Sequence, residues 1–275
     1  MSAYLEHYLA GEHEQVWDDL VALGERVREE PLHSDALAVA RETMRRVRHN
    51  LDLVVPRLER LAYAFGAGFF GDMTPAEESE ARRQAPVVAP PAPMTYAHFT
   101  ELESAVGPLP LSLRAFYELV GSVNLVGRFP GGTVGLRPQG IQGSQQRQLP
   151  ERSKVAGSLD FGSELDPLFV YSLEMALVLF RDWRDRRTAS GQSLLPYQLP
   201  VSPDCYGKYG TSGGGNYSVE VPCAATDAPL LLEWHKTTFV NYLRICFRCA
   251  GFPGLERVAH PPQELLYLTE GLLPI

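Results

Sequence analysis

Four cysteines and a histidine near the end of the chain have side chains suited to metal or nucleophile chemistry. The thiols are Cys205, Cys223, Cys246 and Cys249, and together they would supply four ligands to zinc. However, the C-x-x-C pair formed by the last two falls within a segment of helical periodicity, and Cys246 lies on its apolar face. We therefore favour reduced thiols packed in the core, and keep a zinc-binding protein as an alternative.

A cysteine nucleophile is a second chemistry that these residues would support. It needs a base beside the thiol and a carboxylate that orients the base, and Asp204, Cys205 and His235 have the required types. Their spacing does not require them to meet. A cysteine-dependent enzyme thus stays an alternative, and our prediction is a protein without catalytic residues, metal or cofactor.

The glycines at 213–215 suggest a phosphate-binding loop. The chain continues from them into a segment of strand composition, so no helix N-terminus follows to complete an anion site. The GxxxxGK[ST] pattern is absent from the sequence. We interpret these glycines as a turn.

Aromatic and polar side chains lie on both sides of this turn, near the expected strand ends. Such residues are typical of the centres of protein interfaces. The predicted partner-binding residues are Asp204, Tyr206, Lys208, Tyr209, Trp234, His235 and Lys236.

The composition is that of an ordinary globular protein of 275 residues, with 45% hydrophobic and 21% charged residues and a net charge of −8. This acidity argues against direct nucleic-acid binding, which needs clustered Lys and Arg. No apolar run approaches the roughly 18 residues that span a bilayer, so no membrane association is expected. The first residues do not resemble a secretory leader, and we expect a cytoplasmic location.

The elements that carry these residues follow a helical first part. Residues 12–30 have helical spacing, and the next helix carries the most regular apolar pattern of the chain. Its residues Leu37, Ala40, Met44, Val47, Leu51, Val54, Leu58 and Leu61 form a seam. We predict an intramolecular hairpin of the two helices, and keep a homodimer through the 37–61 seam as an alternative. Pro56 lies off the seam and should bend the helix without interrupting it.

Three regions follow from these patterns: a helical hairpin at 1–70, an Ala/Pro-rich linker at 71–94, and an α+β domain at 95–275. In the last region, cap and stop signals predict helices from Thr95 and from Pro110, and a helix capped by Ser172. They also predict a helix from Thr237 or Thr238 that ends at Gly251. Strands are expected near 168–171, 194–201, 217–222 and 230–234. We therefore predict an α+β fold with a mixed or antiparallel sheet flanked by helices.

Three segments of this region carry a family resemblance: LPLSLRAFYELVGSVN at 109–124, GGNYSVEVP at 214–222 and FVNYLRICF at 239–247. Together they resemble the SUKH superfamily over about 95–260, and an uncharacterised bacterial group that joins such a domain to N-terminal helices. The resemblance implies an immunity protein that binds and neutralises a toxin or effector. The alternative is a structural or regulatory subunit that assembles through the N-terminal helices.

Overall fold

The computed structural model describes residues 3–66, 80, 86–129, 166–191, 193, 196–208, 214–257 and 263–275. Its helices are α1 (Ala3–Leu9), α2 (His13–Ala22), η1 (Gly24–Arg28), α3 (Leu32–Arg60), α5 (Thr95–Val106), α6 (Leu111–Leu119), α7 (Leu173–Ala189), α8 (Cys205–Lys208), α9 (Phe239–Arg248), η3 (Leu255–Arg257) and α10 (Gln263–Thr269). Its strands are β1 (Ala64–Phe65), β2 (Val88–Ala89), β3 (Ser122–Asn124), β4 (Gly127–Arg128), β5 (Phe169–Val170), β6 (Tyr197–Pro203) and β7 (Asn216–Val221). None of the described helices is both long and apolar enough to cross a membrane.

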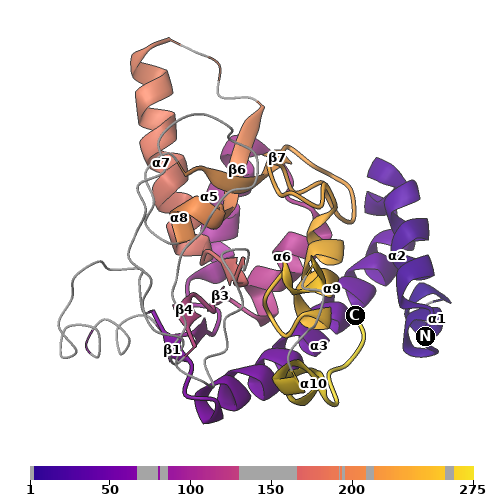
Figure 1. The fold of residues 1–275 in the computed structure, drawn as a ribbon. Helices are drawn as coiled ribbons and strands as arrows, with labels where there is room; N and C mark the ends of the chain where they lie inside the picture. Colours follow the sequence, from indigo (N-terminus) through magenta and orange to yellow (C-terminus); the bar gives the residue numbers. More distant parts are fainter. Residues whose placement is uncertain are drawn as a thin grey trace.

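The predicted α+β class is confirmed, because helices pack around small antiparallel sheets (Figure 1). The longest ladder joins β6 to β7, with Tyr197 opposite Val221 and a register shift between Pro200 and Ser202. A second sheet has the order β2-β3-β5, and β1 pairs with β4. Every ladder between the described strands is antiparallel.

Helix α3 carries the predicted seam through the middle of the molecule. The seam residues Ala40, Met44, Val47, Leu51, Val54 and Leu58 have no exposed surface. They pack within the chain, where α3 contacts α1, η1, α6 and α10. Pro56 lies inside the helix, which continues to Arg60. A dimer through this seam would have to displace these intramolecular contacts.

The first helices are held to α3 by buried polar contacts. The Trp17 indole donates to the Thr43 hydroxyl over 3.1 Å, between α2 and α3. Asp35 lies in the first turn of α3, but its carboxylate accepts hydrogen bonds from the backbone N–H groups of Tyr4 and Leu5. It therefore stabilises the start of α1, whose first N–H groups have no partner within the helix.

The last residues of the sequence lie along α3 and are held through their backbone. The amide of Asn50, which is fully buried, donates to the Leu273 carbonyl over 2.9 Å and accepts from the Leu273 N–H over 2.7 Å. Arg46 donates to the Pro274 carbonyl. One helix thus binds segments from the two opposite ends of the sequence.

The two regions that the sequence separates at 71–94 share one core. Buried side chains of α2 and α3 and those of α5, α6, β7 and α9 belong to one hydrophobic cluster. Val88 and Ala89, which fall within the expected linker, pair with Val123 and Ser122 as strand β2. This end of the expected linker is therefore part of a sheet.

Caps define two helices that position the candidate site. Ser172 caps α7 as predicted, because its hydroxyl accepts a hydrogen bond from the Met175 N–H. For α9 the predicted capping side chain is wrong. Thr238 makes no capping bond, and the Val240 N–H donates instead to the carboxylate of Asp227, which is buried and also accepts from Ser112 of α6.

Gly121 marks a close approach that the sequence pattern indicates only as a helix stop. Its φ is +90°, and a Cβ atom there would overlap the carbonyl oxygen of Ala89. Gly191 also has a left-handed φ, of +67°, but among the described residues no atom beyond its chain neighbours lies within 4 Å of its Cβ position.

We predict that Gly121→Ala lowers the free energy of unfolding by about 3 kcal/mol or more, because backbone strain adds to the overlap with β2. Gly191→Ala should cost about 1–2 kcal/mol, since only the strain applies. Urea denaturation of the two variants measures the difference. Equal losses would mean that the segment at Ala89 does not pack against Gly121.

Candidate functional site

The turn at 231–236, which we call the recognition turn, interrupts the segment that we predicted as a strand at 230–234. That prediction is wrong for most of its length. Only Leu231 pairs with β7, in an isolated bridge to Ser218. The next residue, Leu232, has a φ of +65°, which turns the chain away from the sheet.

Leu232 combines two unusual properties in one side chain. A left-handed backbone costs a branched residue about 1–2 kcal/mol, and Leu232 keeps 76% of its surface exposed. Lys236, at the end of the same turn, is also left-handed with a φ of +53°. Such strain persists where the surrounding structure imposes it, and it is concentrated at functional sites.

Charged side chains impose the shape of this turn. His235 Nδ1 lies 2.6 Å from Glu233 Oε1, and its Nε2 lies 2.9 Å from Glu256 Oε1 of η3. The backbone N–H of His235 donates to the other oxygen of Glu233, whose side chain is fully buried. The Lys236 N–H closes the turn on the Glu233 carbonyl. Burial raises the pKa of Glu233, and its bonds with His235 oppose that rise.

Leu232 lies at the rim of a groove of about 470 Å³ between α7 and the β6–β7 hairpin. Figure 1 shows α7 beside this hairpin at the top of the view. The helix contributes Leu179, Trp183 and Arg187, and the hairpin contributes the exposed polar residues Gln198 and Glu220. The groove therefore combines apolar side chains with charged and hydrogen-bonding groups.

Trp183 is the largest side chain in this groove. Its ring lies 4.4 Å from that of Tyr197 on β6, measured between centroids, and the Arg187 guanidinium lies over its face. Arg187 is held in turn by the backbone carbonyl of Ser193. Tryptophan and arginine are among the residue types most enriched at the centres of protein interfaces.

Sequence reasoning missed both Leu232 and Trp183. Trp183 falls in the helix predicted to begin after Ser172, and Leu232 falls in the strand predicted at 230–234. The signal that could have located the turn is the run of three leucines at 230–232, which lacks the alternation of a half-buried strand.

Of the predicted partner-binding residues, Lys208 is wrong, because its side chain has no exposed surface. Its Nζ lies 2.6 Å from Asp166 Oδ1, and the Tyr217 hydroxyl donates to the other oxygen of Asp166. Lys208 also lies over the Tyr217 ring. A buried ammonium needs such a counter-ion, so this lysine is part of the scaffold.

The other predicted residues fall into two groups, one before β7 in the sequence and one after it. Asp204 and Tyr206 are half-buried, and the Asp204 carboxylate accepts hydrogen bonds from Gly207 and Gly215, which shapes the turn there. Trp234 and His235 are half-buried, and their tilted rings lie 4.6 Å apart, measured between centroids. Lys236 is exposed. Tyr209 lies outside the described residues.

The Cys–His–Asp arrangement does not assemble. Both ring nitrogens of His235 contact carboxylates, and burial raises the pKa of the Cys205 thiol. Cys246 and Cys249 are buried in the core, as the helical pattern predicts. Burial and a bond to Glu256 raise the pKa of Cys249 to about 12, so this thiol is not activated as a nucleophile. The described residues contain no group of three or more His, Cys, Asp or Glu placed to hold a metal ion.

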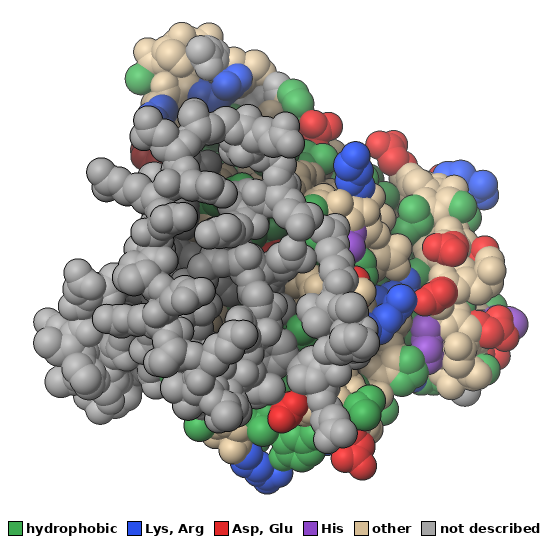
Figure 2. All heavy atoms as spheres, in the orientation of Figure 1, with side chains coloured by type: hydrophobic (Ala, Val, Ile, Leu, Met, Phe, Trp, Pro, Cys, Tyr) green, Lys and Arg blue, Asp and Glu red, His purple; other side chains and the backbone are tan. Residues whose placement is uncertain are grey.

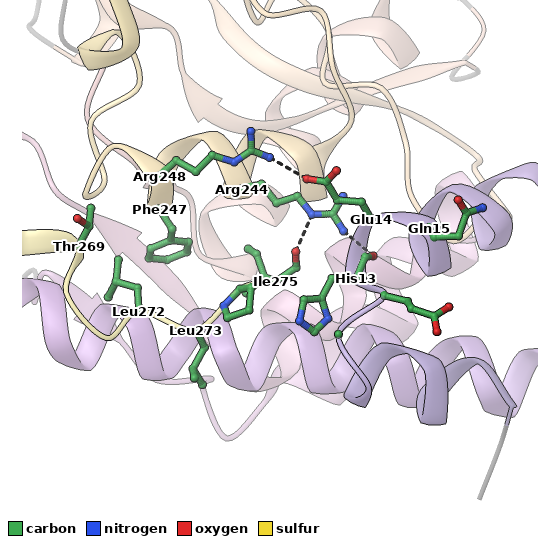
Figure 3. A pocket seen from close by; sticks show the side chains of 13 residues that line it. His13, Glu14, Gln15, Arg244, Phe247, Arg248, Thr269, Leu272, Leu273 and Ile275 are labelled. Carbon is green, nitrogen blue, oxygen red and sulfur yellow. Dashed lines mark hydrogen bonds and ion pairs between the residues drawn. The ribbon is translucent and has the colours of Figure 1, made fainter. Parts of the chain in front are cut away.

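A second groove, of about 570 Å³, lies between α9, the start of α2 and the last residues (Figure 3). Phe247 and Leu272 give it an apolar wall, and Arg244 lies at its edge. The Arg244 guanidinium is buried and donates to the backbone oxygens of Ile275 and His13. Because these bonds join segments of the chain itself, we assign this groove a structural role.

We predict that Lys208→Met lowers the free energy of unfolding by about 3–5 kcal/mol, because the buried Asp166 carboxylate would lose its counter-ion. Adding Asp166→Asn to this variant should recover a large part of the loss, since the uncompensated charge is removed. The exposed Lys236→Met should change stability by about 0.5 kcal/mol or less. Denaturant titration tests all three variants, and a harmless Lys208→Met would contradict the buried pair.

Comparison of the chain with protein-family models, with curated proteins and with solved structures found no match in any of the three. The resemblance to the SUKH superfamily stays a prediction.

Proposed function

We propose that the protein is a non-enzymatic binding module that recognises another protein, a toxin or effector, in the cytoplasm. The contact surface in this proposal is the groove between α7 and the β6–β7 hairpin together with the recognition turn. The observation that carries the proposal is Leu232, an apolar side chain held in a strained backbone and exposed to water.

Leu232 supports a binding role because its own side chain gains little from folding. Its side chain is 76% exposed, so little apolar burial offsets the left-handed strain. Burying a leucine fully in a partner would contribute about 1.5–3 kcal/mol. The half-buried Trp183 offers a second anchor in the same groove.

The charge of the protein supports a basic partner. Figure 2 shows Asp and Glu side chains gathered at the right of the view, where α1 and α2 lie in Figure 1. The exposed acidic residues of these helices and of η1 are Glu6, Glu12, Glu14, Asp18, Asp19 and Glu25. These residues lie outside the proposed groove, so they would act on a positively charged protein through the long-range field rather than by direct contact. The resemblance to the SUKH superfamily points to the same class of partner, a toxin.

The direct test is co-expression with the product of the neighbouring gene. The proposal expects that this product is toxic when expressed alone, that the chain restores growth, and that the two proteins co-purify. If the chain neither restores growth nor binds the product, the immunity role is excluded for that pair.

We predict that Leu232→Gly separates binding from stability. Glycine releases the strain of about 1–2 kcal/mol but adds entropy to the unfolded chain, so stability should change by about 1 kcal/mol or less. Affinity for the toxin should fall about tenfold or more, because the buried apolar contact is lost. Leu266→Ala, at a leucine that is 74% exposed on α10, is the matched control and should leave affinity unchanged. Calorimetric titration and thermal melting measure both effects, and unchanged affinity in Leu232→Gly would remove the turn from the interface.

A further inference from the structure

The side chain of His235 joins the recognition turn to the segment that follows α9. Glu233 lies in the turn itself, and Glu256 lies in η3, so the imidazole bridges two separate pieces of chain. Glu256 is fixed in turn, because its other oxygen accepts hydrogen bonds from the Gly254 N–H and the Cys249 thiol. The histidine thus connects a strained turn to a well-anchored carboxylate.

To bond to both carboxylates at once, the His235 ring must be in a particular protonation state. A neutral imidazole has one N–H donor and one acceptor nitrogen, whereas an imidazolium has two donors. Two carboxylates at 2.6 Å and 2.9 Å are both acceptors when ionised. The geometry therefore fits the doubly protonated ring, and a neutral ring would turn a lone pair toward one of the carboxylates.

We propose that His235 is a protonation-dependent pin, which holds the recognition turn in its binding shape as an imidazolium and releases it when the ring loses a proton. The regulatory part of this inference rests on the proposed function, because it makes binding of the toxin through Leu232 weaken as the pH rises.

The charged groups around the ring determine the direction of this effect. Burial by itself lowers the pKa of His235, but the hydrogen bonds and charges of Glu256 and Glu233 outweigh it, and the net pKa is raised. Asp166 adds negative charge near Glu233. Lys236 lies in the same turn, but its side chain is exposed to water.

The direction of the His235 pKa shift determines how the stability of the turn depends on pH. A histidine whose pKa is raised by folding contributes stability that is fully present below its unfolded value of about 6.5, and this stability is lost as the pH rises through the folded pKa. Burial raises the pKa of Glu256, but its bonds with His235 and backbone N–H groups lower it overall, so its contribution is lost only in acid. The turn should therefore be held most firmly in weakly acidic to neutral solution.

The local test is amide hydrogen exchange, followed by NMR between pH 6 and pH 9.5 and expressed as protection factors. The Leu231 and Lys236 N–H groups are hydrogen-bonded in the pinned turn, to Ser218 and Glu233. Their protection should fall at least tenfold as the His235 ring titrates, while that of Val219, inside the β6–β7 ladder, should stay constant. His235→Gln should show low protection at every pH, because the single amide nitrogen of glutamine cannot reach the two carboxylates that the two ring nitrogens of His235 contact. His7→Gln, at an exposed histidine far along the chain, should behave as the unchanged protein.

A ring that titrates near pH 6.5, or protection at Leu231 and Lys236 that does not change across the range, overturns the proposal whatever the partner does. If His235→Gln fails to fold, the titration of the unchanged protein decides the question alone. The second arm measures affinity for the neighbouring gene's toxin at pH 6.5 and pH 9. If the turn opens as His235 titrates but the toxin binds at neither pH, the proposed function is refuted. The inference that His235 is the pin of the turn then still holds.

Discussion

An apolar stripe along a 29-residue helix must be covered over its whole length, and this requirement organises the molecule. Helix α3 meets it with segments that are distant in sequence: α1 and η1 before it, α6 in the middle of the chain, and α10 near the end. Because one helix serves all of them, the N-terminal helices and the α+β part bury their side chains in a common core. The rest of the chain is then arranged around α6 and α9, which the buried carboxylate of Asp227 joins.

The candidate site is built from α7 and the β6–β7 ladder rather than from α3. The β6–β7 ladder supplies a rigid floor, and α7 supplies a wall that begins at a well-formed cap on Ser172. The ladder next to β7 ends after one residue pair, because the chain turns at Leu232. The recognition turn is thus a loop that is specified by buried charge, while the surfaces on both sides of it are specified by packing.

Much of the fold could be predicted from the sequence, because local signals agree with the tertiary structure where packing is periodic. The cap at Ser172 rests on a bond to a residue three positions away, and the seam on α3 follows from the spacing of apolar residues along one helix. The errors concern contacts between distant residues. Asp227 caps α9 from eleven residues before its cap position, and Lys208 is buried only because Asp166, forty-two residues earlier, supplies its counter-ion.

The difference between local signals and contacts of distant residues also explains how much of the candidate site could be predicted. Composition indicated that the region around Trp234–Lys236 is polar and aromatic, and these three predicted binding residues fall within the recognition turn. It could not indicate which side chain is presented to solvent, because that depends on the left-handed φ of Leu232 and on a bridge from His235 to Glu256, twenty-one residues away. The groove wall at Trp183 depends on the packing of α7 against β6, which no local pattern encodes.

The paired hydrogen bonds between Asn50 and Leu273 have a consequence for how the sequence can vary. Asn50 recognises a peptide group, which every residue except proline presents in the same form. The Leu273 side chain is 39% exposed and makes no part of this contact, so many residue types can replace it. Asn50 has no such freedom, because its buried amide must match both a donor and an acceptor. Among related sequences, the position that is recognised should therefore vary, and the position that recognises it should be fixed.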